Sequence, residues 1–521
     1  MDALLISLQR DIDVIGLKYL HYSLLKGGYK SSLLYLPAFS PDNKVLEQIK
    51  KFVSRVNPKF IGISLMSLEF YDARNLTKYL KHNFKSIPIV WGGIHPTISI
   101  GECLDYADYV CVGEGEKTIL DFAEAINKGG NTKKINNLCY KEGDKVKKNP
   151  LYPLIAELDE IPAYEHVPVG SFIQRGDGRI APINKKVFRE YARYRGTTYS
   201  IISSRGCPFS CTYCCNNFVS QLYKSKKVRK RSIKSIISEL ERTVNDNPDI
   251  EYINFQDDCF LSCGEEYLKE FCEIYKRKIR KPFICRGIPI YVTRNKIECL
   301  KDAGLSWISL GLQSGSNRVC RDVYKRNSFQ ADFLRAARII KKANIAAFYD
   351  VILDNPFETN EDKFETIQTL IETPKPFYTQ FFSLTFYPGT ELYNRVKKGS
   401  CGKVDSAFKK DSLIYRKDDI NNLIRLSAVL NREFMYKIIS LYKQNPKGMK
   451  FKFGLSMGNL LSLFVLEPLT YFRVIKLSQK DSYVGTLKVL PNYFKVGLQR
   501  YFNQFKDQTT VIESKDFEHQ V

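Results

Sequence analysis

The sequence lacks the N-terminal leader of a secreted protein. Its first residues, Met1–Leu8, contain no basic stretch followed by an apolar one, and they are typical of a β-strand. The 14 cysteines are scattered through 521 residues, so they do not form the dense framework of a small disulfide-bonded protein. We therefore expect a cytoplasmic protein in a reducing setting.

Acidic residues are scarce relative to basic ones. The chain has 56 Asp and Glu against 80 Lys and Arg, which gives a formal net charge of +24. Such an excess raises the question of nucleic acid or an anionic membrane surface as a partner. The basic residues are spread along the chain, which favours an ordinary solvated surface over nucleic-acid binding. The densest run, Lys224–Arg231, is a candidate to face an anionic substrate.

Three cysteines, Cys207, Cys211 and Cys214, form a CxxxCxxC loop directly after the β-rich run Tyr199–Ser204. Three thiolates in one loop can hold three irons of a 4Fe–4S cube and leave the fourth iron open to a small molecule. A structural zinc site is the alternative, but zinc prefers four ligands, often paired as CxxC units. No second pair with zinc-like spacing follows, and Cys215 adjoins Cys214 too closely to be an easy fourth ligand. The loop therefore favours a cluster.

The loop resembles the signature of radical S-adenosylmethionine (SAM) enzymes. The resemblance extends to Tyr213, the aromatic residue before the last cysteine, and implies that this ring lies near the adenine of SAM. It also implies that the three cysteines bind the cluster, while the amino and carboxylate groups of SAM chelate the open iron. An exposed cluster is attacked by oxygen, so we expect an anaerobic setting.

Short apolar runs alternate with segments of helical periodicity five times before residue 145, which predicts βα units and a parallel sheet. The expected strands are Ala3–Leu8, Ser32–Leu36, Phe60–Leu65, Ile87–Trp91 and Ala107–Val112. The expected helices are Gly16–Lys26, Lys44–Val56, Ala73–Asn83, Ile98–Tyr106 and Lys117–Asn127. In a doubly wound sheet, ligands bind beyond the carboxyl ends of the strands. That edge carries Gln9–Gly16, Ser64–Ser67, Gly92–Thr97 and Gly113–Glu116.

Two of these loops, within Trp91–Thr97 and Val112–Glu116, together resemble the cobalamin-binding domain that precedes one class of radical SAM enzymes. The resemblance implies a Rossmann-like (flavodoxin-like) cobalamin-binding domain over residues 1–145. Glycines in the loops permit close approach of a ligand to the main chain, and serine hydroxyls offer hydrogen bonds. The candidate cobalamin contacts are Ser64, Ser67, Gly92, Gly93, Gly113, Glu114 and Gly115. A flavodoxin-like module that binds something smaller, or nothing, is the alternative.

One departure concerns the loop after the first strand. Some cobalamin proteins carry a ligand histidine there in a DxHxxG motif, whereas this chain has Asp13 at the corresponding place within Asp11–Gly16. If cobalamin binds, its cobalt has no histidine below it, as the radical SAM subgroup implies. Loss of cobalamin binding is the alternative. His95 is a candidate polar contact, although its place before Pro96 favours a role in a turn.

Residues 146–195 contain five prolines with weak periodicity and predict an ordered connector. Residues 196–420 then give six βα-like repeats, with strands before the cluster loop and at Tyr252–Gln256, Phe283–Gly287, Trp307–Leu312, Ala346–Leu353 and Phe377–Leu384. Six repeats are too few for a closed eight-stranded barrel, and they match the partial (β/α)6 TIM-type barrel that the resemblance implies. Among the polar residues at the strand ends, Asp257, Gln313 and Ser314 are the expected SAM contacts.

Residues 421–521 predict a mainly helical C-terminal region. Asn421–Tyr442 has helical apolar spacing, and the strongly apolar segment 451–475 is expected to cover the barrel mouth or a substrate pocket. Peripheral contact of that segment with a membrane surface, through its aromatics and flanking lysines, is the alternative. Gln508–Val521 is polar and predicted to be disordered.

These features together predict a cobalamin-dependent radical SAM enzyme. The resemblance implies that a reduced cluster cleaves SAM, that the 5′-deoxyadenosyl radical removes hydrogen from an unactivated carbon, and that methylcobalamin delivers a methyl group. The expected partners are a small-molecule or lipid-like substrate and an electron donor such as flavodoxin or ferredoxin. A radical cyclisation or rearrangement is the alternative reaction. A basic, zinc-containing RNA-binding protein is the alternative of another class.

Overall fold

The computed structural model describes residues 1–397, 412–413 and 415–478. These residues form two compact units. The first comprises Met1–Leu305, Cys320–Ser328 and the described part of Thr385–Asp411; the second comprises Ser306–Val319, Phe329–Leu384 and the described part of Ser412–Val521. The division falls inside the predicted barrel, so the domain limits of the sequence analysis stay a prediction.

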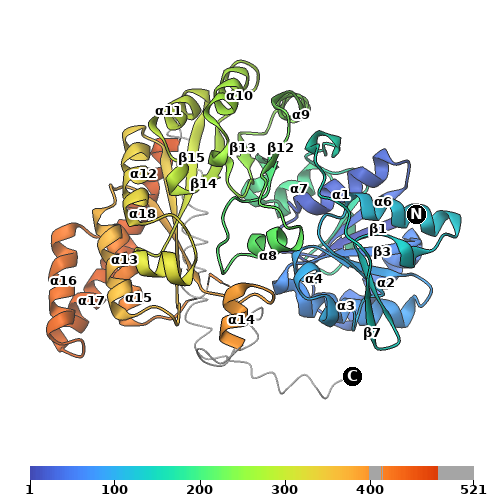
Figure 1. The fold of residues 1–521 in the computed structure, drawn as a ribbon, viewed down its shortest axis with the longest axis horizontal. Coiled ribbons are helices and arrows are strands. Elements are labelled where there is room, and N and C mark those ends of the chain that lie inside the picture. Colours follow the sequence, from blue (N-terminus) through green and yellow to red (C-terminus); the bar gives the residue numbers. More distant parts are fainter. Residues whose placement is uncertain (398–411, 414, 479–521) are drawn as a thin grey trace. The chain divides into compact units, whose positions relative to one another are not determined.

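The first unit begins with a nine-stranded sheet in the order β7-β6-β5-β4-β3-β1-β2-β8-β9. Its five central strands are those predicted, and they pair in parallel. They are β1 (Ala3–Ser7), β2 (Ser31–Tyr35), β3 (Phe60–Ser64), β4 (Ile89–Gly92) and β5 (Tyr109–Cys111). Nearly every residue in them is buried, because helices cover both faces of the sheet, as is usual for parallel strands (Figure 1).

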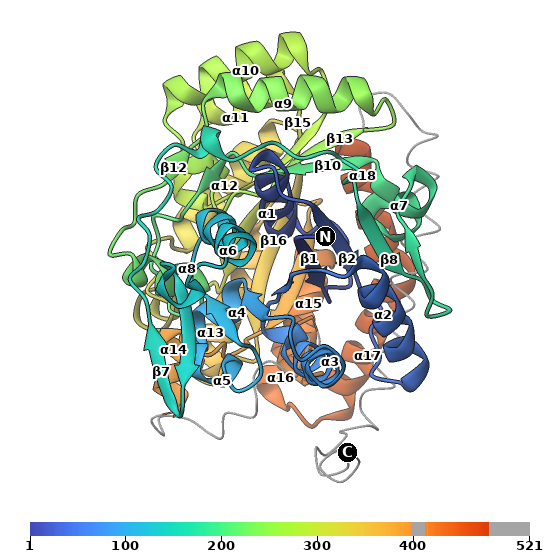
Figure 2. The same cartoon turned by 90° about the vertical axis from the view of Figure 1, so that its right-hand side faces the viewer.

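Two pairs of helices enclose this sheet. Helices α1 (Ile15–Lys26) and α6 (Glu116–Lys128) pack on one face, whereas α2 (Asn43–Val56) and α3 (Phe70–Asn83) pack on the other (Figure 2). Each face therefore has its own apolar core. The predicted helix Ile98–Tyr106 is wrong. The chain forms two short helices, α4 (Ile94–Ile98) and α5 (Ile100–Cys103), because the backbone of Ser99 leaves the helical region with φ −133° and ψ 53°.

The sheet is extended at both edges by strands that sequence periodicity did not predict. A hairpin of β6 (Leu138–Glu142) and β7 (Lys145–Lys148) pairs antiparallel with β5. On the opposite edge, β8 (Ser171–Gln174) pairs with β2, and β9 (Ile180–Pro182) follows it. The predicted connector thus completes the sheet. The other short elements are η1 (Ser67–Glu69), η2 (Thr132–Lys134), η3 (Leu158–Glu160), α7 (Lys185–Tyr191) and η4 (Arg193–Gly196).

The rest of the first unit contains three parallel strands, β10 (Thr198–Ile201), β13 (Tyr252–Phe255) and β14 (Phe283–Gly287). The cluster loop lies between β11 (Ser204–Arg205), which forms a short antiparallel ribbon with β12 (Arg229–Lys230), and α8 (Cys215–Leu222). The remaining helices are α9 (Ile233–Asp246), η5 (Phe260–Ser262), α10 (Glu265–Lys278), η6 (Pro289–Tyr291), α11 (Arg294–Ala303) and α14 (Glu391–Lys397).

The second unit contains the other three predicted strands, β15 (Leu305–Gln313), β16 (Ala346–Leu353) and β17 (Tyr378–Ser383), again in parallel. Helix α12 (Gln330–Lys342) packs on one face, where Phe333 contacts Tyr349. Helix α13 (Asn360–Glu372) begins with a capping box at Thr359. The π-helical turn η7 (Val319–Val323) follows β15 along the chain, but all of its residues except Val319 belong to the first unit. All six strands predicted for the barrel are therefore present.

The C-terminal region is helical, as predicted, but more broken. The expected helix Asn421–Tyr442 is interrupted because Asn431 caps a new helix by accepting from the Phe434 N–H, which separates α15 (Asp419–Val429) from α16 (Arg432–Gln444). The apolar segment forms α17 (Met449–Leu461), the π turn η9 (Ser462–Leu466) and α18 (Glu467–Ser478).

The last described helix, α18, packs against β16 and β17, where the rings of Tyr471 and Tyr378 lie 6.0 Å apart. Its predicted role as a cover of the barrel mouth or of a substrate pocket stays a prediction. Along α17 and η9, Met449, Phe453 and Phe464 are exposed. Among the helices that the structure describes, none has the length and apolar character needed to span a membrane. The prediction for Gln508–Val521 lies outside the described residues.

Candidate functional site

The cluster loop is anchored at its centre by backbone contacts to the 320–328 segment. The Thr212 N–H donates to the Tyr324 carbonyl at 3.0 Å, and the Thr212 hydroxyl donates to the Val323 carbonyl at 2.6 Å. At its start, Gly206 has a φ of 103°, and a Cβ there would lie 3.0 Å from the Lys227 carbonyl oxygen. Only glycine fits this turn without strain.

The three predicted cluster ligands share an apolar surround. Cys211 is buried, Cys207 and Cys214 are half-buried, and all three lie in a hydrophobic cluster with Phe209, Cys259, Ile288, Ile290, Tyr291 and Tyr213. Burial raises the pKa of the Cys207 thiol to about 12. In the protein without metal, the thiol therefore stays protonated, and binding a metal must release that proton.

A buried arginine lies beside these thiols. Arg326 is 5% exposed, donates from Nη1 to the Tyr213 hydroxyl at 3.3 Å and stacks 5.8 Å from the centre of the Phe209 ring. Burial raises the pKa of Cys211, and the positive charge of Arg326 opposes that rise. Sequence reasoning did not find Arg326, because nothing local marks a residue 113 positions beyond Tyr213 as its neighbour.

The donor set fits a 4Fe–4S cube. In a cube each thiolate binds its own iron, so three thiols need not converge on one point. Within the described ranges, no group of three or more His, Cys, Asp or Glu side chains is arranged to hold a single metal ion. Apolar walls and a nearby cation both suit an anionic cluster. Cys207, Cys211 and Cys214 would hold three irons and leave the fourth to SAM.

Asp257, a predicted SAM contact, has partners within the protein. It is fully buried, accepts from the Ser203 hydroxyl at 2.8 Å and from the Ser203 N–H at 3.3 Å, and also binds the Ser204 hydroxyl. Its carboxylate thus holds the segment that leads from β10 into the cluster loop. Its contact with SAM stays a prediction, and the structure adds a positioning role.

A pH-dependent stability difference is expected for Asp257→Asn. Burial raises the pKa of Asp257 to about 6, although the serine hydrogen bonds oppose the rise. The folded protein then binds this proton more tightly than the unfolded chain, so the associated stability is present below about pH 4 and is lost as pH rises through about 6. Between about pH 4 and a pH above 6, the wild-type protein without cofactors should lose about 3 kcal/mol of unfolding free energy relative to the Asp257→Asn variant. Urea denaturation at pH 4 and 7.5 measures it; an equal difference at both pH values would contradict the pKa.

The other two predicted SAM contacts lie in the second unit, at the end of β15. Gln313 has a left-handed backbone with φ 66°. Ser314 is buried, and its hydroxyl donates to Glu358 Oε1 at 2.9 Å. Burial raises the pKa of Glu358 to about 7. This pair was not anticipated, and the roles of Gln313 and Ser314 toward SAM stay predictions.

Four of the predicted cobalamin contacts meet beyond β3 and β4. The Ser67 hydroxyl binds His95 Nδ1 at 2.9 Å, and the buried His95 belongs to helix α4 rather than to the turn that was predicted. Gly92 ends β4. A Cβ on Gly93 would lie 2.8 Å from the Leu65 carbonyl oxygen and 3.3 Å from Ser64 Oγ. The neighbouring atoms of Leu65 and Ser64 leave no room for a Cβ, so position 93 requires glycine.

The remaining predicted cobalamin contacts also have protein neighbours. A Cβ on Gly113 would collide with the Tyr223 hydroxyl at 1.9 Å, and the Glu114 N–H donates to that hydroxyl at 3.3 Å. Gly115 precedes α6 and approaches Leu20. The Glu114 carboxylate pairs with Arg205 and Arg229. Arg229 thus faces a carboxylate of the protein, not the anionic ligand considered for Lys224–Arg231. Contact of these residues with cobalamin stays a prediction.

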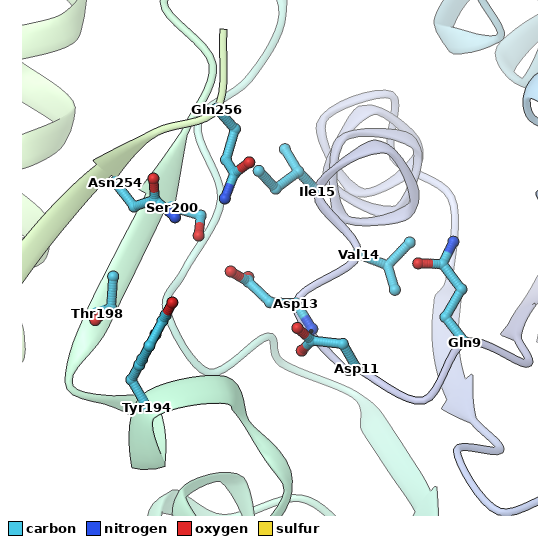
Figure 3. A pocket seen from close by; sticks show the side chains of 10 residues that line it. All are labelled: Gln9, Asp11, Asp13, Val14, Ile15, Tyr194, Thr198, Ser200, Asn254 and Gln256. Carbon is cyan, nitrogen blue, oxygen red and sulfur yellow. Dashed lines mark hydrogen bonds between the residues drawn. The ribbon is translucent and has the colours of Figure 1, made fainter. Parts of the chain in front are cut away.

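A polar pocket of about 260 Å³ lies in the first unit between the loop after β1 and the strands β10 and β13 (Figure 3). Its lining consists of Gln9, Asp11, Asp13, Val14, Ile15, Tyr194, Thr198, Ser200, Asn254 and Gln256. Asn254 is 8% exposed and lies in this lining beside Ser200, its partner in the strand register. Side-chain amides and hydroxyls along the wall of a pocket suit a polar ligand.

The pocket residues on the strands were missed by sequence reasoning. Thr198 and Ser200 alternate along β10, and Asn254 pairs with Ser200 in the register of β13. Polar residues at every second position of a buried strand were the available signal. Asp13, which replaces the ligand histidine, pairs with the buried Lys18 at 2.6 Å. The structure thus gives Asp13 a charge partner on α1.

Two family models match separate parts of the chain. Residues 1–123 match the B12 binding domain, and residues 201–370 match the radical SAM superfamily. An uncharacterized methyltransferase of Pyrococcus horikoshii is 28% identical over 358 residues, which are 68% of this chain and 72% of that protein. An anaerobic magnesium-protoporphyrin IX monomethyl ester cyclase of Rubrivivax gelatinosus is 26% identical over 403 residues, 73% of this chain and 65% of that protein.

Two solved structures share the fold. The cobalamin-dependent SAM radical enzyme OxsB, with aqua-cobalamin and SAM bound, has a TM-score of 0.65 at 15% identity and covers 97% of this chain and 83% of its own. The radical SAM methyltransferase TsrM of Kitasatospora setae has a TM-score of 0.62 at 18% identity and covers 76% of each chain. The predicted order of a B12-binding domain, a radical SAM domain and a helical C-terminal region is confirmed. The chain belongs to the radical SAM enzymes that carry an N-terminal B12-binding domain.

Proposed function

We propose that this protein is a cobalamin-dependent radical SAM methyltransferase that methylates an unactivated carbon of a small-molecule or lipid-like precursor. The observation that carries the proposal is the presence, within one compact unit, of a B12-binding domain and a complete CxxxCxxC loop with an apolar surround. The cofactors are a 4Fe–4S cluster, SAM and cobalamin. When bound, they supply the electron, the radical and the methyl group, and the protein supplies binding and orientation.

The residues of the chain have separable tasks in this function. Cys207, Cys211 and Cys214 would hold the cluster, while their apolar surround excludes water. Asp257 holds the strand segment that enters the loop through Ser203 and Ser204. The pocket beside Asn254 and Gln256 would take a polar group of a ligand, and the carboxyl group of Asp11 in its lining suits an N–H donor.

Support from relatives is of two kinds. The Pyrococcus horikoshii relative is named a methyltransferase, and TsrM is a methyltransferase of similar fold. Radical cyclisation is the second candidate, because the Rubrivivax gelatinosus relative is a cyclase. The two domain matches favour a radical SAM enzyme over the alternative of a zinc-containing RNA-binding protein. We further propose a flavodoxin- or ferredoxin-type electron donor.

The test is anaerobic reconstitution with iron, sulfide, hydroxocobalamin, SAM and a reductant, followed by incubation with metabolite extract. Methyl transfer predicts a brown protein that forms both 5′-deoxyadenosine and S-adenosylhomocysteine, and transfers deuterium from methyl-labelled SAM into a product. A cyclase would form 5′-deoxyadenosine without labelled product. A colourless protein that contains zinc and no sulfide would contradict both reactions.

A further inference from the structure

Two arginines join the loop after β5 to the start of the cluster loop. Arg205 donates from Nη1 to Glu114 at 3.2 Å, and its Nη2 binds Glu116. Arg229, its partner in the β11–β12 ribbon, donates to the two carboxylate oxygens of Glu114 at 2.7 and 3.0 Å. The four side chains are 9–18% exposed. Solvent therefore screens these ion pairs only weakly.

A third contact ties the same loop to the far side of the cluster segment. Tyr223 directly follows α8, the helix that begins at Cys215, and its hydroxyl accepts from the Glu114 N–H at 3.3 Å. Arg205 stands two residues before Cys207, separated from it only by Gly206. The Gly113–Glu116 loop therefore contacts the chain on both sides of the three predicted cluster ligands, at Arg205 before them and at Tyr223 after them.

The loop at the other end of these contacts lies where a second cofactor is expected. Gly113–Glu116 follows β5, at the carboxyl edge of the parallel sheet, and ligands of such sheets bind beyond that edge. A guanidinium fork holds two carboxylates in a fixed plane, which a lysine ammonium cannot do. The contacts therefore specify a separation between two segments that are 89 or more residues apart in sequence.

We propose that Arg205, Arg229 and Tyr223 are positioning residues that hold the cluster loop at a set distance from the cobalamin-side loop through Glu114 and Glu116. The proposal rests on the proposed function, because it requires both cofactors in one protein. Transfer between bound groups is steeply sensitive to their spacing, and a displacement of about 1 Å can lower a rate by about 100-fold.

The test measures the spin–spin interaction between the reduced cluster and Co(II) cobalamin by EPR in the full-length reconstituted protein. In Arg205→Met, iron, sulfide and corrin contents should stay within about twofold of wild type, because neither cofactor is bound by Arg205. The spin–spin interaction should weaken or become heterogeneous, since two carboxylates lose their shared partner. Arg205→Lys should restore it only in part. The matched control is Arg175→Met, which removes a single, more exposed ion pair with Glu190.

A wild-type interaction in an Arg205→Met protein that carries both cofactors would overturn the proposal. If that variant does not fold, Arg205→Lys and Tyr223→Phe decide: an altered interaction in either supports the proposal, and a wild-type interaction in both overturns it. A wild-type protein that binds the cluster but no cobalamin would instead overturn the proposed function.

Discussion

Replacing Cys211 by alanine is expected to abolish both the cluster and the cleavage of SAM. Cys211 is the middle ligand of the CxxxCxxC loop and is 7% exposed, so no water can easily take the place of its thiolate. With two thiolates left, the cube loses a corner that the protein had stabilised. Iron and sulfide content should fall to background, and 5′-deoxyadenosine should not accumulate above the level without enzyme.

The control for this result is Cys215→Ala. Cys215 adjoins Cys214 and is half-buried, but it begins α8 rather than belonging to the CxxxCxxC set. The variant should keep about the iron content and SAM cleavage of wild type. Both proteins are compared by circular dichroism to establish that they are folded. Retention of iron and cleavage in folded Cys211→Ala would refute the assignment of the cluster ligands.

Replacing Arg326 by methionine is expected to lower the reduction potential of the cluster. The guanidinium is buried beside Cys211 and Tyr213, and a positive charge there stabilises the more negative, reduced cluster. One poorly screened charge contributes on the order of 2 kcal/mol at short range, which for a one-electron couple is on the order of 100 mV. An EPR-monitored redox titration measures the shift, and SAM cleavage with a mild reductant should slow accordingly.

Two further variants separate charge from packing at this position. Arg326→Lys keeps the charge and should retain most of the wild-type potential. Arg321→Met removes an arginine from the same segment that is 63% exposed and pairs with Asp322, and it should leave the potential unchanged. Equal potentials in wild type and Arg326→Met, with the cluster intact, would show that the charge of Arg326 does not act on the cluster.

The prediction of the fold from sequence was most accurate where the signal is local. The five central strands of the first sheet and the six strands of residues 196–420 were all identified, because continuous apolar runs alternate with helical periodicity. The edge strands β6–β9 were missed, since short, partly exposed strands carry little apolar pattern and are stabilised by pairing with a distant neighbour.

In the candidate site, too, the features with a local sequence signal were predicted and those that depend on distant neighbours were not. The CxxxCxxC loop was identified because its three ligands lie within eight residues. The glycines at positions 93 and 113 were predicted to permit close approach of a ligand, and that prediction is untested; the atoms that approach them in the structure belong to Leu65 and Tyr223. Sequence reasoning could indicate that a side chain was excluded there, yet it could not identify what excluded it.

The sequence by itself determined the chemistry of the cluster loop and the succession of strands and helices, because both depend on residues that are neighbours in the chain. Only the tertiary structure decided which side chains surround that loop. Arg205 meets Glu114 across 91 positions, and Arg326 meets Tyr213 across 113. Such pairings arise from the packing of whole elements against one another, and no local pattern encodes them.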